Sequence, residues 1–272
     1  IYGAVASVSV ADLFIGGIVP GVVLALALSL FIFVRVSLRP ADAPRTEQRF
    51  SWRERFASLA NIWHAALLVV VVLGSIYSGL ATPSEAAGIG AFGAFVIAAL
   101  IFNSLTLASF GRLLISTARI SGAILLIIGC AKIFGDYLNM VRVPQLLTET
   151  LTASGLPDWA ILLAVMGLLI LLGMIVDAVS LIVVTTPVLL PLIISMGYDP
   201  LWFGIVLVLN LEIAVITPPV GLNLYALRGV CPELSVEEII KSALPFVAVQ
   251  FAVLMLFVLF PAISLWLPGL MH

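Results

Sequence analysis

The chain has 272 residues, of which 63% are hydrophobic and only 10% are charged, and its mean hydropathy is +1.28. Soluble domains are about 45–50% apolar and about a quarter charged, so this composition excludes an ordinary soluble protein and indicates an integral membrane protein. A net charge of −2 with no basic face excludes nucleic acid as an expected partner. The two cysteines and the two histidines have no metal-ligand spacing, so neither a disulfide framework nor a structural zinc site is expected.

The first predicted membrane span covers about residues 13–34. Residues 35–55 follow and carry half of the twelve basic residues of the chain: Arg35, Arg39, Arg45, Arg49, Arg53 and Arg55. The positive-inside rule places this segment in the cytoplasm. Trp52, Phe56 and Leu59 suggest the apolar face of an interfacial helix, and a solvated loop is an equally good interpretation.

A second span is predicted over residues 62–77, and a helix follows from Thr82 to about residue 102. Residues 82–85 read Thr-Pro-Ser-Glu, which predicts a capping box at the start of that helix, with an ion or substrate role for Glu85 left open. Residues 88–93 match the pattern GxGxxG, but no strand precedes them. We interpret these glycines as points of close helix packing rather than as a dinucleotide site.

An apolar run over residues 120–133 precedes a predicted loop over residues 142–157. Two pairs of apolar segments then follow, and polar, glycine and proline residues interrupt each pair. The first pair covers residues 159–176 and 180–196, and the second covers residues 201–216 and 222–230. A turn at residues 197–200, with Asp199 as the N-cap, separates the two pairs.

The C-terminal part should begin with a capping box made by Ser235 and Glu238, and a last span is predicted over about residues 244–266. With the arginine-rich segment inside, ten of the twelve basic residues become cytoplasmic. This result is the same whether residues 159–196 form a re-entrant hairpin or two full spans. Charge therefore supports the topology without deciding between these two arrangements.

The first interruption is Gly173-Met-Ile-Val-Asp177-Ala-Val-Ser180. A carboxyl group within an apolar segment costs roughly 2.5–3.5 kcal/mol on insertion scales, which favours a functional role for Asp177. The same side chain could cap the helix that begins near Ala178, because anionic groups suit helix N-termini. The two interpretations are compatible, and both stay open.

The second interruption is Ile216-Thr217-Pro218-Pro219-Val220-Gly221-Leu222-Asn223. Two adjacent prolines remove two backbone donors, so the helix should unwind and free its last carbonyls. Carbonyls and a threonine hydroxyl are oxygen ligands suited to sodium, and the start of the next helix suits a carboxylate. A simple proline kink is the alternative. Glu212, just before this break, faces either a cavity or another helix.

No pairing of a nucleophile with a base suggests an enzyme. An aspartyl intramembrane protease would need two aspartates in neighbouring spans, and only Asp136 and Asp177 are available, without the usual glycine contexts. The paired interruptions instead indicate a secondary transporter, in which irregular backbone at membrane depth lines a binding site.

A set of short motifs runs in order through nearly the whole chain: Tyr2-Gly3, Leu13-Phe14, residues 17–21 (GIVPG), residues 79–87 (GLATPSEAA), residues 197–200 (GYDP), Phe203-Gly204, Asn210-Leu211, residues 217–224 (TPPVGLNL), Phe260-Pro261 and Leu267-Pro268. In this order they resemble the C-terminal part of the large membrane subunit of tripartite ATP-independent periplasmic (TRAP) transporters, the DctM-like family. The chain also starts at Ile1 rather than Met and shows no signal peptide, so we expect a fragment of a longer protein.

The resemblance implies an all-α polytopic membrane protein that forms half of an inverted-repeat, elevator-type transporter, with a re-entrant hairpin and a broken helix. Its expected parts are the last span of the first repeat (1–36), a cytoplasmic basic amphipathic linker (37–58), scaffold spans with an arm helix (59–140), the transport-domain hairpin and broken helix (141–230) and a C-terminal span (231–272). The first hairpin of the family and its Pro-Pro-Ser break are absent from this sequence, so this chain alone should not transport.

The resemblance also implies sodium-driven uptake, across the bacterial inner membrane, of a carboxylate handed over by a periplasmic solute-binding protein. A small four-helix membrane subunit would be a further partner, and no organic cofactor is implied. The implied ion-binding residues are Gly173, Val176, Asp177, Ser180, Thr217 and Pro218, and the implied substrate-binding residues are Pro219, Gly221 and Asn223. The alternatives are a carboxylate or ion symporter that works without a binding protein, and a non-transporting membrane scaffold.

Overall fold

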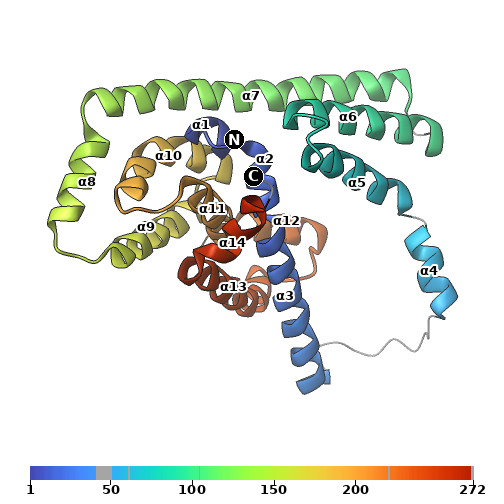
Figure 1. Ribbon diagram of the computed structural model, residues 1–272. Coiled ribbons are helices and arrows are strands. Elements are labelled where there is room, and N and C mark those ends of the chain that lie inside the picture. Colours follow the sequence, from blue (N-terminus) through green and yellow to red (C-terminus); the bar gives the residue numbers. More distant parts are fainter. Residues whose placement is uncertain (41–50, 61, 104, 220, 271–272) are drawn as a thin grey trace. The chain divides into compact units, whose positions relative to one another are not determined.

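The computed structural model describes residues 1–40, 51–60, 62–103, 105–219 and 221–270, and its regular elements in these ranges are helices (Figure 1). In chain order they are α1 (Tyr2–Ala6), α2 (Val10–Gly16), α3 (Ile18–Leu38), α4 (Trp52–Ala60), α5 (Trp63–Tyr77), α6 (Pro83–Val96), a π-helical turn (Ile97–Ile101), α7 (Leu107–Met140), α8 (Val143–Ala153), α9 (Asp158–Gly173), α10 (Ala178–Ser195), α11 (Pro200–Val215), α12 (Leu222–Val230), α13 (Val236–Leu259) and α14 (Pro261–Gly269). The predictions that concern Arg45, Arg49, Val220 and His272 lie outside the described residues, as does the side chain of Leu59.

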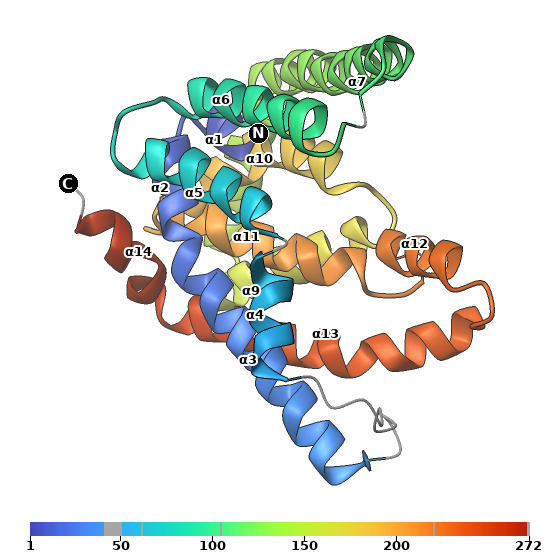
Figure 2. The same ribbon diagram turned by 90° about the vertical axis from the view of Figure 1, so that its right-hand side faces the viewer.

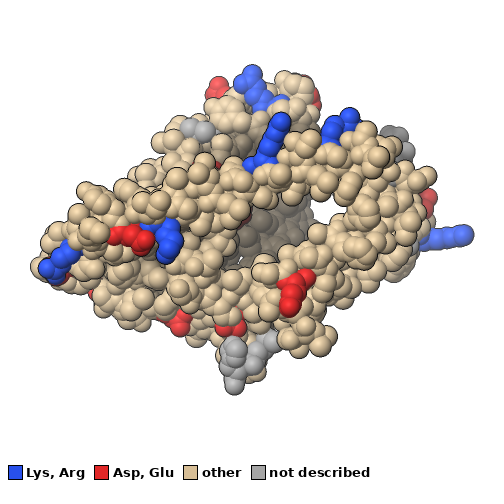
Figure 3. All heavy atoms as spheres, turned by 90° about the horizontal axis from the view of Figure 1, so that it is seen from above, with Lys and Arg blue, Asp and Glu red and all other residues tan. Residues whose placement is uncertain are grey.

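Five helical segments in the described ranges are long and apolar enough to cross a membrane: Val10–Leu38, Pro83–Ile101, Leu107–Met140, Ala178–Ser195 and Val236–Leu259. On the face seen in Figure 3, charged side chains are few and scattered among uncharged ones. Both observations confirm the prediction of an all-helical, polytopic membrane protein.

The chain divides into two compact units, one formed by Ile1–Phe33 with Ala123–His272 and the other by Val34–Gly122. In the second unit, α5 packs against α6. A Cβ atom on Gly90 would lie 2.8 Å from Val72 Cγ2, and one on Gly93 would lie 2.6 Å from Leu68 Cδ2. Two glycines of the GxGxxG pattern therefore serve close helix packing, as predicted.

Both predicted capping boxes are present. The Glu85 carboxylate accepts hydrogen bonds from the backbone N–H and the hydroxyl of Thr82, each at 2.8 Å, and the Thr82 hydroxyl accepts one from the Glu85 N–H. Ser235 and Glu238 repeat this arrangement at the start of α13. The Glu85 carboxylate therefore has a structural partner.

Helix α11 forms the centre of the first unit and contacts α9, α13, α2, α10 and α14. Its Trp202 and Phe203 are among the largest fully buried side chains. The Trp202 indole N–H donates to the Phe257 carbonyl at 2.9 Å. That carbonyl lacks its usual helical donor because the residue four positions later is Pro261, which has no N–H. The indole therefore supplies a hydrogen bond that the proline removed.

The N-terminal helices lie against α11 at Gly204. A Cβ atom on Gly204 would overlap the Tyr2 ring and would lie 2.9 Å from Leu13. The Tyr2 hydroxyl donates to the Pro200 carbonyl at 2.7 Å. Burial, with a smaller contribution from the negative charge of Asp199, raises the pKa of the Tyr2 phenol well above its usual value. Tyr2 therefore stays a neutral donor that joins α1 to the start of α11.

The structure corrects two predicted boundaries. Residues 142–157 were predicted as a loop, yet Val143–Ala153 form α8, whose Leu147 and Leu151 pack against the core. The local signal was present but overlooked, because Pro144 lies in the first turn and Leu147 and Leu151 are spaced on one helix face. The last span was predicted over residues 244–266. Helix α13 instead begins at Val236, directly after the capping residue Ser235, and ends at Leu259, because Pro261 begins the separate helix α14. Figure 2 shows α12 beside the first part of α13.

The close approach at Gly204 gives a first prediction. The substitution Gly204→Ala should destabilise the protein by about 1–3 kcal/mol, because the added methyl group meets the Tyr2 ring in a packed core. Gly167→Ala is the matched control, because Gly167 also lies in a helix but has open space around its Cα. Thermal unfolding in detergent would measure both. Equal melting temperatures for the two variants would contradict the packing assignment.

Candidate functional site

The two predicted interruptions are real helix breaks, and they contact each other. Helix α9 ends at Gly173 and α10 begins at Ala178, whereas α11 ends at Val215 and α12 begins at Leu222. The Gly221 N–H in the second break donates to the Met174 carbonyl in the first at 3.3 Å. A Cβ atom on Gly173 would lie only 2.7 Å from the Ala214 Cβ atom. The fold therefore brings together two segments that are distant in sequence.

Asp177 is the N-cap of α10. Its carboxylate accepts a hydrogen bond from the Ser180 N–H at 2.9 Å, and its side chain is otherwise exposed. A buried carboxylate would need such bonds to offset its desolvation, whereas an exposed one needs them less. The capping interpretation from the sequence is confirmed.

Thr217 lies where α11 unwinds. Its backbone N–H donates to the Ala214 carbonyl at 3.1 Å, and its hydroxyl donates to the Ile213 carbonyl. The Ala214 and Val215 carbonyls would normally accept from residues 218 and 219, but both are prolines without an N–H. Helix geometry stops at Val215 and resumes only at Leu222, so the prolines break the helix rather than merely kink it.

Gly221 is required by its conformation and by its surroundings. Its φ of +56° lies in the left-handed region, which L-residues with a side chain rarely adopt. A Cβ atom there would also lie 2.9 Å from Leu224 Cδ1 and 3.1 Å from the Thr217 carbonyl oxygen. The chain can therefore turn back toward α12 within the break only because residue 221 is glycine.

The predicted site residues divide by exposure. Gly173 and Gly221 are buried at the contact between the breaks, and Ser180, Thr217 and Pro218 are half-buried. The exposed members are Val176, Asp177, Pro219 and Asn223. Glu212, whose role the sequence left open, is exposed on α11 and is not among these contacts. Eight of the nine predicted residues belong to the two breaks or to the first turns after them, and the ninth, Gly173, is the last residue of α9.

Sequence reasoning missed the residues that join the breaks. Ala214 and the Met174 carbonyl have no distinctive sequence signal, because a backbone oxygen and a small apolar side chain are common in any membrane helix. Asn210, which was singled out from the sequence only as part of a motif, joins helix α11 to helix α9, because its buried side-chain amide donates to the Met166 carbonyl at 3.1 Å. An amide side chain within a largely apolar helix was the signal that could have identified this contact.

The site can offer oxygen ligands rather than a transition-metal centre. No group of three or more His, Cys, Asp or Glu side chains in the described part of the chain is arranged to hold a metal ion. The Thr217 hydroxyl uses its proton for the Ile213 carbonyl, so its lone pairs stay available as acceptors. Carbonyl and hydroxyl oxygens of this kind suit a hard monovalent cation.

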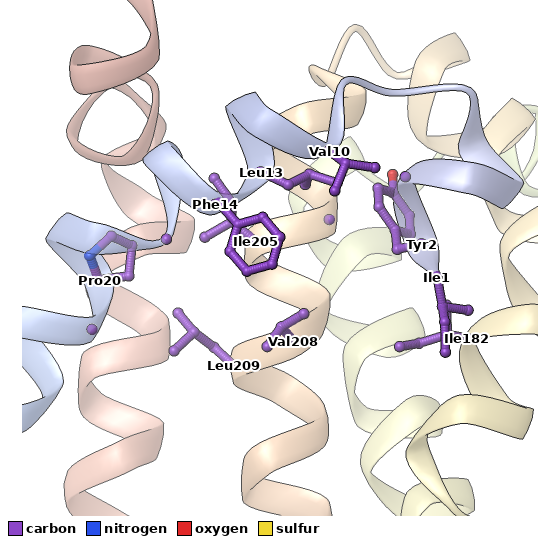
Figure 4. A pocket seen from close by; sticks show the side chains of 14 residues that line it. Ile1, Tyr2, Val10, Leu13, Phe14, Pro20, Ile182, Ile205, Val208 and Leu209 are labelled. Carbon is purple, nitrogen blue, oxygen red and sulfur yellow. The ribbon is translucent and has the colours of Figure 1, made fainter. Parts of the chain in front are cut away.

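A separate apolar cavity of about 500 Å³ lies between the N-terminal helices and α11 (Figure 4). Tyr2, Leu13, Phe14, Ile205 and Val208 are among its lining residues. The single hydroxyl in this lining, that of Tyr2, is already bonded to the Pro200 carbonyl. None of the lining residues belongs to either break, and their side chains offer no group to bind a carboxylate.

The fold and the site define a polytopic helical membrane protein with two contacting helix breaks, an arrangement typical of secondary transporters. Comparison with known families agrees, because the family described as the tripartite ATP-independent periplasmic transporter, DctM component, matches residues 1–263. The chain belongs to this family, which is a family of transporter permeases and not of enzymes.

Three relatives illustrate the range of the family. The chain is 37% identical to the C4-dicarboxylate TRAP transporter large permease protein DctM of Rhodobacter capsulatus, over 98% of this chain and 60% of the relative. It is 34% identical to the isethionate TRAP transporter permease protein DctMQ of Oleidesulfovibrio alaskensis, over 99% of this chain and 42% of the relative. It is 32% identical to the sialic acid TRAP transporter large permease protein SiaM of Vibrio cholerae, over 99% of this chain and 62% of the relative. The chain thus spans less than two thirds of each relative.

The cap at Asp177 gives a second prediction. Asp177→Ala should lower stability by about 1 kcal/mol, because the Ser180 N–H loses its acceptor. Asp177→Asn should stay within a few tenths of a kcal/mol of the parent protein, because asparagine caps about as well as aspartate. Thermal unfolding in sodium-free detergent solution would measure both. If Asp177→Asn lowers the stability as much as Asp177→Ala does, the negative charge stabilises the fold more than the hydrogen bond does.

Proposed function

We propose that this chain is part of a permease that couples sodium entry to the uptake of a carboxylate-bearing solute across the bacterial inner membrane. The observation that carries the proposal is the contact between the two breaks, in which the Gly221 N–H bonds to the Met174 carbonyl. Unwound backbone at membrane depth is costly unless it is buried or binds something, and two such segments here share one place.

The ion-binding part of the site would use oxygens from both breaks. The Val215 carbonyl has no helical donor because of Pro219, and the Thr217 hydroxyl has free lone pairs. Ser180 is half-buried at the first turn of α10 and would add a second hydroxyl. The backbone carbonyls of Gly173, Val176 and Pro218 and the carboxylate of Asp177 complete the proposed ligand set. These donors fit a sodium ion by their chemistry.

The substrate part would lie at the N-terminus of α12. Backbone N–H groups at the first turn of a helix have no partner within that helix and carry a positive partial charge. Asn223 is exposed in this turn, next to Gly221 and Pro219. A carboxylate placed here would accept hydrogen bonds from the first-turn amides and from the Asn223 side chain.

The proposed architecture is one repeat of an elevator-type transporter, with α9 and α10 as a re-entrant hairpin and α11 with α12 as the broken helix. At 16 residues, α9 is about 24 Å long and falls short of a hydrocarbon core of about 30 Å, whereas α10, with 18 residues, lies at the lower limit for a span. A hairpin that enters and leaves on one side needs no greater length. The part of each relative that this chain does not match, which is more than a third of its length, would correspond to the other repeat.

The proposed partners follow from the tripartite organisation that the family name states. A periplasmic binding protein would deliver the solute, and a small four-helix membrane subunit would brace the scaffold. The relatives are named for C4-dicarboxylates, isethionate and sialic acid, and all of these carry a carboxylate or sulfonate group. We therefore expect an organic anion as the substrate, with its identity determined largely by the binding protein.

Uptake by the complete permease in proteoliposomes tests the proposal. We expect accumulation of a labelled organic acid only with an inward sodium gradient and the cognate binding protein together. Uptake that needs sodium but ignores the binding protein would instead indicate an ordinary symporter. Absence of uptake under every condition, from protein shown to be folded, would leave the scaffold interpretation in place.

A matched pair of threonine variants tests the ion site. Thr217→Ala should raise the sodium concentration for half-maximal uptake by roughly 10-fold or more, because a hydrogen bond or ligand to a charged group contributes about 1.5–3 kcal/mol. Thr185→Ala is the control, because the Thr185 hydroxyl also donates to the carbonyl four residues earlier, that of Leu181, but lies inside α10. Equal sodium dependence in the two variants would remove Thr217 from the proposed ligand set.

A further inference from the structure

Helix α4 carries an aromatic pair on one exposed face. Trp52 and Phe56 are one helical turn apart, so both lie on the same side of the helix. Their ring centroids are 6.4 Å apart, and the two residues are 72% and 65% exposed. Burying two aromatic side chains is strongly favourable in water, so this face should have a partner outside the described chain.

The charges of α4 are arranged symmetrically around that face. At 100° per residue, Arg53 and Arg55 lie roughly 80° to either side of its centre, and Glu54 lies on the opposite side. The Arg55 guanidinium lies 4.9 Å from the centroid of the Trp52 ring. The Glu54 carboxylate accepts bonds from the Ser51 N–H at 2.7 Å and from its hydroxyl at 2.9 Å. The acidic group is thus used for a helix cap, while both basic groups border the aromatic face.

The position of α4 in the chain puts it next to the membrane. The candidate span Val10–Leu38 precedes it, and the apolar helix α5 begins at Trp63, soon after α4 ends at Ala60. Placing α4 in the hydrocarbon as a continuation of α5 is unfavourable, because each of its charged side chains would cost roughly 2.5–3.5 kcal/mol there. The interface satisfies both faces, with aromatic rings at the boundary of the acyl chains and charges among the headgroups.

We propose that α4 lies in the cytoplasmic membrane interface and that Arg53 and Arg55 bind the phosphate groups of acidic phospholipids. The cytoplasmic leaflet carries a negative surface potential that attracts such basic segments. A guanidinium also matches a phosphate in a planar, two-bond geometry. The acyl-chain boundary of this leaflet matches the aromatic face, and its acidic headgroups match the two flanking arginines. This proposal does not depend on sodium coupling or on the substrate.

The experiment uses spin labels in the complete permease, with Cys130 and Cys231 first replaced by serine. One protein carries a single label on the aromatic face, attached through Phe56→Cys. A second protein carries a single label on the polar side, attached through Ala57→Cys. Each protein is reconstituted in phosphatidylcholine vesicles with or without phosphatidylglycerol. In acidic vesicles we expect the label at position 56 to be accessible to oxygen, which dissolves in the membrane, and the label at position 57 to a water-soluble nickel chelate.

The charge dependence is tested with the double variant Arg53→Gln/Arg55→Gln in the position-56 background. Each arginine near an acidic surface contributes about a 5-fold preference for the membrane-bound position, so removing both should lower the ratio of immersed to aqueous label roughly 25-fold. Arg112→Gln/Arg119→Gln is the matched control, because it removes two exposed arginines from α7 and leaves α4 intact. In the control, the ratio of immersed to aqueous label should depend on phosphatidylglycerol as it does in the parent protein.

Two results would overturn the proposal. Equal access of the nickel chelate to both labels in every lipid would show that α4 is solvated and does not lie in the interface. The second result is a position-56 label that is protected from the nickel chelate only when the small membrane subunit is present. If this protection depends neither on acidic lipid nor on the two arginines, the aromatic face binds a protein partner.

Discussion

The structure depends on how the chain replaces backbone donors that its prolines remove. A membrane interior offers no water to satisfy a freed carbonyl, so each missing N–H must be replaced by another group or must serve a purpose. At Pro261 the replacement is the Trp202 indole, which bonds to the Phe257 carbonyl from a different helix. At Pro218 the replacement is the Thr217 N–H, which tightens the last turn of α11. At Pro219 the described residues supply no such replacement for the Val215 carbonyl, which belongs to the proposed ion site.

This contrast separates structural prolines from functional ones. Pro261 lies at the boundary between α13 and α14, and its freed carbonyl is buried and bonded. Pro218 and Pro219 lie between the end of α11 at Val215 and the start of α12 at Leu222, and this break meets the first break where the Gly221 N–H bonds to the Met174 carbonyl. The local effect of proline is the same in both places. The different outcome comes from the surroundings, because Trp202 of α11 donates to the Phe257 carbonyl, whereas the described residues place no comparable donor at the Val215 carbonyl.

The sequence was informative wherever the signal is local. Capping boxes at Thr82 and Ser235, the N-caps Asp177 and Asp199 and both helix breaks were predicted, because each depends on residues within one or two turns. Helix α8 was missed although its local signal was present, in Pro144 and in the spacing of Leu147 and Leu151. The contact between the breaks had no such signal, because it joins a backbone N–H to a backbone oxygen. Charge could not decide whether α9 and α10 span the membrane, since both arrangements put the same residues on the same sides.

The approach of Gly173 to Ala214 also constrains how the family can vary. The space between these two Cα atoms holds a single methyl group, which this chain carries on residue 214. Moving that methyl group to residue 173 would keep the total volume, whereas adding a second would force α9 away from α11. Homologous sequences should therefore conserve the sum of the two side-chain volumes more strictly than either residue alone. A correlated exchange of glycine and alanine at this pair would record, in sequence, the contact that brings the two breaks together.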